Sequence, residues 1–234
     1  MTSQKAAENG KLNVAIDGPA GAGKSTVARR VASELSYIYV DTGAMYRAVT
    51  YYMLRHEIEP EDVDSVLKHL RELSIELVPD ANGQKVLLNG EDVSGPIRSR
   101  EVTGIVSLYS QIEDLRTHLV ELQRVMALRK GVVMDGRDIG TTVLPDAEVK
   151  IFMTASVKER ALRRFNELEK TDDLTLEQLE SDIAARDKLD QEREISPLRQ
   201  ADDAIVLDTT SMSIDEVVEH IVSRCYEVGR EVDL

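Results

Sequence analysis

The chain reads VAIDGPAGAGKST from Val14 to Thr26, where an apolar run breaks into a glycine-rich loop and then into a helical pattern. Gly18, Gly23, Lys24 and Ser25 match the phosphate-loop pattern G-x-x-x-x-G-K-[ST]. A glycine-rich turn between a strand and a helix, without a ligand, is the alternative. The strand before, the helix after and the complete motif occur together, which favours nucleotide binding.

The chemistry of this motif explains its spacing. Small residues let successive backbone N–H groups turn inward around a phosphate, and the N-terminus of the next helix adds partial positive charge. Lys24 can then bridge the β- and γ-phosphates, while the Ser25 hydroxyl can bind Mg²⁺ carried by the nucleotide. We therefore expect an ATP site made by the loop residues Gly18, Pro19, Ala20, Gly21, Ala22, Gly23, Lys24, Ser25 and Thr26.

Length and composition limit the class of protein. The 234 residues are 42% hydrophobic and 31% charged, enough for one large α/β domain with smaller lobes and without a run that could span a membrane. The single cysteine, Cys225, excludes an intrachain disulfide framework. The polar stretch 1–11 lacks the apolar segment of a secretory signal, so we expect a cytoplasmic protein whose residues 1–10 are a disordered leader or an expression remnant.

The net charge of −14 excludes another class. General nucleic-acid and anionic-membrane binders need a basic face, so we expect neither partner. A phosphate-rich ligand must therefore meet arginines that are concentrated locally.

Alternating strand and helix patterns predict an α/β fold with a central parallel sheet. The predicted strands are Leu12–Asp17, Tyr37–Val40, Gly131–Asp135, Val149–Thr154 and Ala204–Leu207. The predicted helices are Lys24–Leu35, Ala44–His56, one from Asp62 or Asp64 to about Leu73, Glu101–Lys130 in two pieces, Ser156–Glu169, Leu176–Arg193 and Ile214–Val228.

One region departs from this alternation. Ser74–Pro79 and Lys85–Leu88 read as strands around Asn82-Gly83, a strong hairpin signal, and Asn89-Gly90 offers a second turn. We expect a small antiparallel lobe inserted into the parallel core rather than further strands of its sheet.

Arginines beside predicted loops suggest a second anion site. Arg47, Arg137, Arg186 and Arg193 could together hold an acceptor that carries its own phosphate, although each alone is more typical of a solvated surface. The spacing puts Arg186, Asp190 and Arg193 on one helical face. Intrahelical salt bridges and a shared ligand explain that pattern equally well.

Two aspartates follow the buried strand that ends near residue 135. Asp135 suits a magnesium role in the second coordination shell, because it comes at a strand end. The alternative for Asp135 and Asp138 is capping of the loop backbone at Gly136 and Gly140.

Together these segments resemble the bacterial cytidylate kinases, within the nucleoside monophosphate kinases. The resemblance covers nearly everything from Leu12 to about Val228. The segments that carry it are Ile16–Thr26 (IDGPAGAGKST), Asp41–Arg47 (DTGAMYR), Asn89–Arg98 (NGEDVSGPIR), Asp135–Ala147 (DGRDIGTTVLPDA), Arg186–Arg193 and Ser196–Leu198.

The resemblance implies a P-loop three-layer core, a monophosphate-binding region enlarged by the antiparallel insert, and a short lid. We expect the core to comprise residues 11–41, 131–155 and 195–234. The monophosphate-binding region would be 42–130, with its insert at about 74–100, and the lid region with its helices would be 156–194.

The resemblance also implies roles for individual residues. Arg47, Arg137 and Arg193 would hold the acceptor phosphate. Ser107, Arg116 and Asp138 would bind cytosine, and Arg186 with Asp190 the pentose. Thr42, where relatives often have serine, keeps the hydroxyl of that position. The lid carries several arginines, and Arg164 is the catalytic candidate among them, although the sequence leaves open which one reaches the transferring phosphoryl group.

The activity that follows is transfer of the γ-phosphoryl group of ATP to CMP or dCMP, with Mg²⁺ bound through ATP. We expect a monomer whose partners are these nucleotides. Three alternatives remain: a P-loop kinase for UMP or another monophosphate, a P-loop switch or regulator, and a kinase of a metabolite without phosphate. The arginine set disfavours the last two, which need no second anion site.

Overall fold

The computed structural model describes residues 10–80, 83–167 and 174–232. Of the predicted leader only Gly10 is described, and Asn82 of the predicted hairpin turn lies outside the described residues. The end of the helix predicted for Ser156–Glu169 also lies outside them. Within the described ranges, no helix has both the length and the apolar character needed to cross a bilayer.

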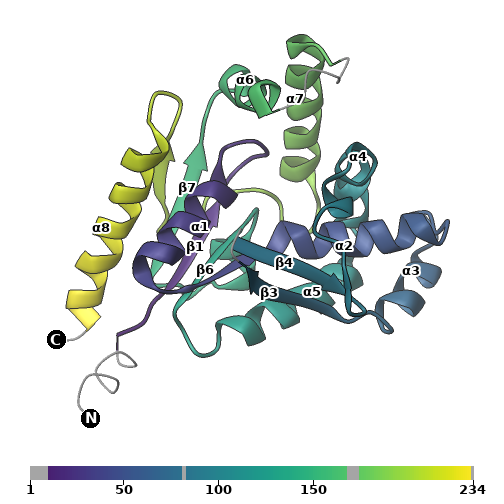
Figure 1. Ribbon diagram of the computed structural model, residues 1–234, viewed down its shortest axis with the longest axis horizontal. Helices are drawn as coiled ribbons and strands as arrows, with labels where there is room; N and C mark the ends of the chain where they lie inside the picture. Colours follow the sequence, from purple (N-terminus) through teal and green to yellow (C-terminus); the bar gives the residue numbers. More distant parts are fainter. Residues whose placement is uncertain (1–9, 81–82, 168–173, 233–234) are drawn as a thin grey trace.

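A parallel sheet of five strands forms the centre of the molecule, in the order β2-β6-β1-β7-β8 (Figure 1). The strands are β1 (Asn13–Asp17), β2 (Ile38–Asp41), β6 (Val132–Gly136), β7 (Val149–Thr154) and β8 (Ile205–Asp208). This sheet confirms the predicted α/β class, and each strand lies within a residue or two of its predicted bounds.

Helices cover both faces of the sheet because its buried strands are apolar on both sides. Val14 and Ile16 pack with α1 (Lys24–Leu35) and α8 (Ile214–Val232) in one apolar cluster. The intervening Ala15 packs with α5 (Glu113–Ala127) on the other face. The alternation of side chains along a strand thus produces the three layers.

A second apolar cluster lies beside the sheet, where the sequence predicted an inserted lobe. It joins α2 (Thr42–Arg55), α3 (Val63–Leu70) and α4 (Arg100–Tyr109) to an antiparallel sheet and the start of α5. That sheet consists of β3 (Ile75–Asp80), β4 (Gly83–Leu88) and β5 (Glu91–Asp92) in sequence order, and the short helix η1 (Pro96–Arg98) follows it. The antiparallel insert is therefore confirmed.

Gln84 joins the two sheets. Its Nε2 donates to the carbonyl oxygen of Tyr39 at 2.6 Å, and its Oε1 accepts from the backbone N–H of Asp41 at 3.2 Å. The side-chain amide of β4 therefore pairs with the free edge of β2 as a neighbouring strand would.

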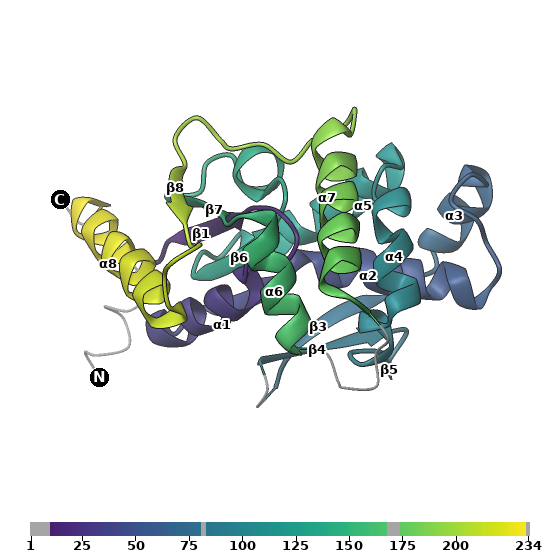
Figure 2. The same cartoon turned by 90° about the horizontal axis from the view of Figure 1, so that it is seen from above.

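A third, smaller cluster joins the two helices predicted as the lid region. Ala161 of α6 (Val157–Glu167) packs against Leu179 and Ile183 of α7 (Leu176–Glu192), and the two helices lie side by side (Figure 2). Thr175 begins α7 with a reciprocal capping box to Gln178, which fixes the start of the helix.

Two helix boundaries in the inserted lobe differ from the prediction by two or three residues. The helix predicted from Ala44 begins at Thr42, because the Asp41 carboxylate accepts the N–H of Ala44 at 2.8 Å. The helix predicted to reach about Leu73 ends at Leu70.

Gly18 begins the loop between β1 and α1 in a conformation that only glycine accepts readily. Its φ is +150°, and a Cβ added there would lie 2.1 Å from the carbonyl oxygen of Met153. The missing side chain lets the loop leave β1 directly against β7.

We expect Gly18→Ala to lower the free energy of unfolding by at least about 2 kcal/mol, because strain and overlap with a backbone oxygen add together. Gly104→Ala is the matched control. Residue 104 lies within α4, and a Cβ there meets nothing within 4 Å. The free energy of unfolding of that control should rise by about 0.5–1 kcal/mol. Urea unfolding of both variants is the measurement, and equal effects would contradict this account of Gly18.

Candidate active site

The parallel register brings three carboxylates to one edge of the sheet. Asp41 of β2 lies opposite Asp135 of β6, and Asp17 of β1 lies opposite Gly136, the next residue of β6. The phosphate loop begins at this edge, directly after Asp17. Parallel sheets usually bind ligands at the carboxyl ends of their strands.

The phosphate loop bends through left-handed glycines, with φ of +74° at Gly21 and +86° at Gly23. Lys24 begins α1 but folds back over the loop, and its Nζ donates to the carbonyl oxygen of Pro19 at 2.7 Å. Burial lowers the pKa of Lys24 well below its usual value, and the positive charge of Arg137 acts in the same direction. An anion in the loop would stabilise the charged form of this lysine.

Asp135 lies where α1, β2 and β6 meet. Its two carboxylate oxygens accept from Ser25 Oγ at 2.8 Å and from Tyr39 OH at 2.9 Å. Burial, followed by the charge of Asp41, raises its pKa to about 6. Its carboxylate thus binds side chains and does not cap the nearby loop backbone.

The donors next to the loop fit a magnesium ion that arrives with a nucleotide. A hydroxyl and a carboxylate are oxygen ligands of the kind that Mg²⁺ prefers, and Ser25 and Asp135 supply both. Among the residues that the structure describes, no group of three or more His, Cys, Asp or Glu side chains could hold a metal alone. The chemistry of the site therefore fits Mg²⁺ held jointly by protein and phosphates.

Asp17 has a part in the site that the sequence reasoning missed. Its carboxylate accepts the backbone N–H groups of Ile139 at 2.8 Å and Gly140 at 2.7 Å, and so holds the segment that follows β6. Burial nevertheless raises its pKa to about 7. An acidic residue between a buried strand and a glycine loop was the available signal.

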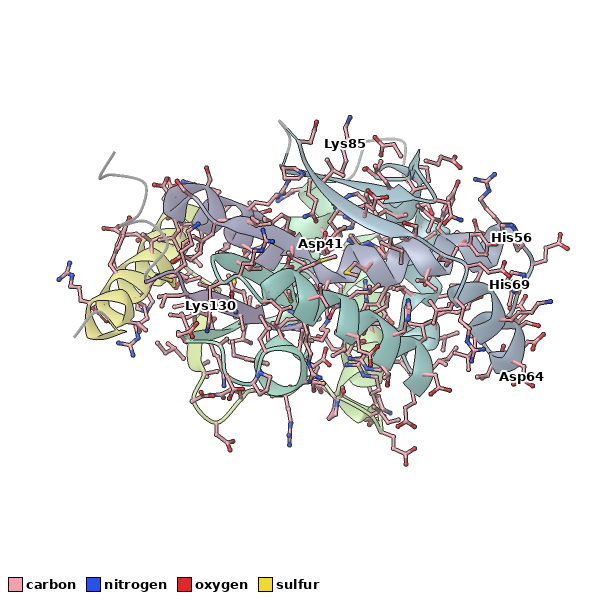
Figure 3. All side chains as sticks on the ribbon, turned by 90° about the horizontal axis from the view of Figure 1, so that it is seen from below. Asp41, His56, Asp64, His69, Lys85 and Lys130 are labelled. Atoms are coloured by element: carbon pink, nitrogen blue, oxygen red, sulfur yellow. The ribbon has the colours of Figure 1, made fainter. Side chains whose placement is uncertain are left out.

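Asp41 and Thr42 connect the start of α2 to the same edge. The Asp41 carboxylate accepts from Arg47 Nη2 at 3.1 Å and 3.3 Å, while Arg98 lies 3.8 Å away. The hydroxyl of Thr42 donates to the carbonyl oxygen of Asp135 at 2.7 Å. Figure 3 shows Asp41 near the middle of the molecule, well away from His56 at the far end of α2.

Asp190 of α7 connects the lid region to the sheet. Its carboxylate accepts from Arg137 Nε at 2.8 Å and from Ser107 Oγ at 3.3 Å, so its partners come from two other elements. Burial alone would raise its pKa, but Arg137 and Arg186 lower the pKa below its usual value. Asp190 therefore contacts residues outside α7. The spacing of Arg186, Asp190 and Arg193 alone fitted intrahelical salt bridges and a shared ligand equally well.

Three guanidinium groups of the site keep a buried N–H without a partner in the described part of the chain, and they are Nε of Arg47, Nε of Arg116 and Nε of Arg186. The charges of Arg47 and Arg186 act on each other beside the Asp190 cluster. Burial, followed by the charge of Arg137, lowers the pKa of Arg186 to about 10. Each such N–H is costly to leave unpaired, and an anion between Arg47 and Arg186 would satisfy theirs.

The last part of the site is a buried pair between α5 and the segment after β6. Arg116 Nη2 donates to Asp138 Oδ2 at 2.5 Å, and the guanidinium lies 5.3 Å from the centre of the Tyr46 ring. Asp138 thus pairs with Arg116 and does not cap the loop with its side chain. Arg193 donates to the Ser196 carbonyl and lies 3.4 Å from Ser110 Oγ.

The arginines of α6 differ in exposure. Arg164 is exposed on α6, whereas Arg160, one turn earlier, is buried against the phosphate loop. The sequence analysis gave no role to Arg160. Its clue was an arginine next to apolar residues at the start of a helix, a pattern that surface helices also show.

Known proteins resemble this chain over most of its length. A family model described as cytidylate kinase matches residues 14–227. A protein named cytidylate kinase from Bacillus cereus (strain G9842) is 56% identical over 214 residues, which cover 91% of this chain and 95% of that protein. Its namesake from Bacillus thuringiensis (strain Al Hakam) is 55% identical over 213 residues, with the same coverage.

Among solved structures, an uncharacterized protein from Eubacterium ventriosum ATCC 27560 shares the fold. It is 11% identical, with a TM-score of 0.50 over 93% of this chain and 99% of that one.

The raised pKa of Asp17 predicts a pH dependence of stability. The folded chain binds this proton more tightly than the unfolded chain, so the contribution of Asp17 to the free energy of unfolding falls as pH rises from 3.8 to about 7. We therefore expect Asp17→Asn to become more stable relative to the parent over this range, by at most about 1.4 kcal/mol per pH unit.

Urea unfolding at several pH values measures this difference. Asp203→Asn is the control, because Lys150 lowers the pKa of Asp203 and its titration lies below the range. That variant should differ from the parent by a constant amount between about pH 5 and pH 7. A constant difference for Asp17→Asn as well would contradict the raised pKa.

Proposed function

The chain belongs to the cytidylate kinase family, and on that premise we propose that it transfers the γ-phosphoryl group of ATP to CMP or dCMP. The products are ADP and CDP or dCDP. The observation that carries this proposal is a cluster of buried and half-buried arginines, of which Arg137 and Arg186 lie close enough to the phosphate loop to affect the charge of Lys24. A nucleotide-hydrolysing switch has no need of such a cluster.

ATP binds with its phosphates in the loop Gly18–Thr26. The backbone N–H groups of the loop and the N-terminus of α1 bind the phosphates. Lys24 turns from the Pro19 carbonyl to the β- and γ-phosphates, where its charge is stabilised.

Ser25 would hold Mg²⁺ together with the nucleotide, and Asp135 would act through its hydrogen bond with Ser25. The ion would neutralise charge on the phosphates. The remaining contributions come from the side chains of this chain.

The acceptor phosphate lies among Arg47, Arg137 and Arg193, with Arg186 beside them. The partnerless Nε groups of Arg47 and Arg186 support this assignment, because they are buried donors beside the cluster. Arg186 and Asp190 then bind the pentose, and Thr42 fixes the start of α2 through its bond to β6.

Cytosine is read by Ser107, Arg116 and Asp138. Asp138 already gives one carboxylate oxygen to Arg116, which leaves the other to accept the N4 amino group of cytosine. Arg116 donates to the N3 and O2 acceptors of the base. Uracil presents O4 to the carboxylate and N3–H to the guanidinium, so UMP is a poor substrate.

The reaction needs no covalent enzyme intermediate. An oxygen of the acceptor phosphate forms the new bond to the γ-phosphorus, while the bond from that phosphorus to the bridging oxygen of ADP breaks. Lys24 and the arginines stabilise the negative charge of the transferring phosphoryl group. Closure of the lid region 156–194 brings Arg164 to this group. Closure excludes water, which would otherwise take the phosphoryl group.

The protein acts as a cytoplasmic monomer without nucleic-acid or membrane partners.

An ADP-release assay with a panel of acceptors tests the function. ADP should form rapidly with CMP and dCMP, and slowly with UMP, with AMP or without an acceptor. Equal release with and without CMP would identify an ATPase and contradict the proposal.

We expect Lys24→Ala to lower kcat by about 100-fold or more while the protein still melts cooperatively near the parent temperature, because this buried lysine serves the ligand and not the core. Turnover and thermal melting are measured together. The control is Lys68→Ala, an exposed lysine of α3 that should keep parental turnover. A loss below about tenfold, which is about 1.4 kcal/mol of barrier, would mean that Lys24 does not stabilise the transferring group.

Asp138→Asn should reduce the ratio of kcat/KM for CMP over UMP by about tenfold or more, because an amide can turn its N–H₂ toward uracil O4. The specificity constants of both acceptors are the measurement. Asp114→Asn changes an exposed aspartate of α5, the helix that carries Arg116, and should leave the ratio unchanged. An unaltered ratio in Asp138→Asn would remove this residue from base recognition.

A further inference from the structure

A buried ion pair joins the two helices α6 and α7 at the phosphate loop. Arg160 Nη2 and Asp187 Oδ2 are 2.6 Å apart, and their side chains are only 4% and 11% exposed. Neither residue has a role in the function proposed above. Arg160 is held in addition by its Nε, which donates at 2.9 Å to the carbonyl oxygen of Ala155, the residue that follows β7.

Both members of this pair also bind the backbone of one loop residue, Ala20. Asp187 Oδ1 accepts its N–H at 3.3 Å, and Arg160 Nη1 donates to its carbonyl oxygen at 2.8 Å. The two peptide groups on either side of Ala20 are therefore fixed in orientation. Gly21 makes the close approach possible, since a Cβ there would lie 3.3 Å from Arg160 Cβ.

The first of these peptide groups also carries the acceptor for Lys24. Its carbonyl oxygen belongs to Pro19 and accepts Lys24 Nζ at 2.7 Å, while its N–H is the one that Asp187 holds. A single peptide plane thus connects the lysine of the loop with the ion pair. If that plane rotated, Lys24 would lose its acceptor.

Stability alone is a poor explanation for this pair. Removing two charges from water is costly, and apolar residues of similar volume often replace a buried ion pair without loss of stability. Apolar side chains cannot bind the N–H and C=O of Ala20. The charged side chains of Arg160 and Asp187 are therefore needed for their hydrogen bonds to the phosphate loop.

Helix α7 also contacts the residues assigned above to the acceptor nucleotide. Three residues after Asp187, Asp190 bonds to Arg137 and Ser107. The same helix therefore contacts the donor loop and the acceptor cluster, so a shift of α7 would move both.

We propose that Arg160 and Asp187 are positioning residues for the donor nucleotide, which set the peptide planes around Ala20 and thereby the conformation of the phosphate loop. This inference rests on the proposed phosphoryl transfer only for the identity of the donor. ATP should bind about tenfold or more weakly when the pair is absent, while KM for CMP stays within about twofold because the contacts of Asp190 remain.

The decisive variant is the double substitution Arg160→Met with Asp187→Leu, which replaces both charges by apolar residues of similar size and avoids an unpaired buried charge. The single variants Arg160→Met and Asp187→Leu complete a double-mutant cycle. Thermal melting reports the fold, and titration with a fluorescent ATP analogue without acceptor reports the donor site. Steady-state kinetics then give KM for ATP and for CMP separately.

We expect the double variant to melt within a few degrees of the parent and to bind the ATP analogue at least about tenfold more weakly. The matched control is Lys188→Met, an exposed neighbour on α7 that lies 3.9 Å from Glu192 and should bind like the parent. A well-folded double variant with parental affinity would overturn the proposal. If the double variant does not fold, Asp187→Asn decides in the same assay, with parental affinity again overturning the proposal.

The two proposals fail separately. A parent protein that binds the ATP analogue but phosphorylates neither CMP nor dCMP would contradict the proposed function and leave the test of the ion pair intact. Parental ATP affinity in the folded double variant, with CMP still phosphorylated, would contradict the role of Arg160 and Asp187 alone.

Discussion

Parallel pairing aligns the ends of β1, β2 and β6 and so brings Asp17, Asp41 and Asp135 to one buried edge of the sheet. Like charges at such close quarters, removed from water, are costly. This cost raises the pKa of Asp135. Burial contributes most to the increase, and the charge of Asp41 contributes next. Each carboxylate accepts hydrogen bonds. Asp17 accepts from two backbone N–H groups, Asp41 from Arg47, and Asp135 from two hydroxyls. Asp41 is thus paired with a positive charge, whereas Asp17 and Asp135 accept from neutral donors.

The same edge meets the lid region through buried charge pairs. Arg137 with Asp190, and Arg160 with Asp187, connect α7 to the sheet and to the phosphate loop. Because both aspartates lie on one helix within a single turn, α7 contacts both the phosphate loop and the arginine cluster. A transfer reaction depends on alignment of donor and acceptor, since reacting atoms must be held at near-contact distance and water kept out.

Much of this could be predicted from sequence because the signals are local. Continuous apolar runs identify β1 and β6, Asn82-Gly83 marks the antiparallel insert, and glycine spacing identifies the phosphate loop. Partners across elements were not predictable. Nothing in the spacing of Asp190 says that it bonds to Arg137, and nothing near Arg160 says that it reaches Ala20. Such pairs depend on how α7 lies over the sheet, which follows from packing of distant segments. The role of Asp17 was not predictable either, because its partners Ile139 and Gly140 lie 122 and 123 residues further along the chain.

The central claim is that the phosphoryl group passes to a second nucleotide held by arginines rather than to water. Labelling the γ-phosphate of ATP follows that group directly. With CMP present, the account predicts that the label appears in the β-position of CDP as fast as ADP forms, with little free phosphate. Label recovered mainly as inorganic phosphate, at a rate that CMP does not change, would contradict it.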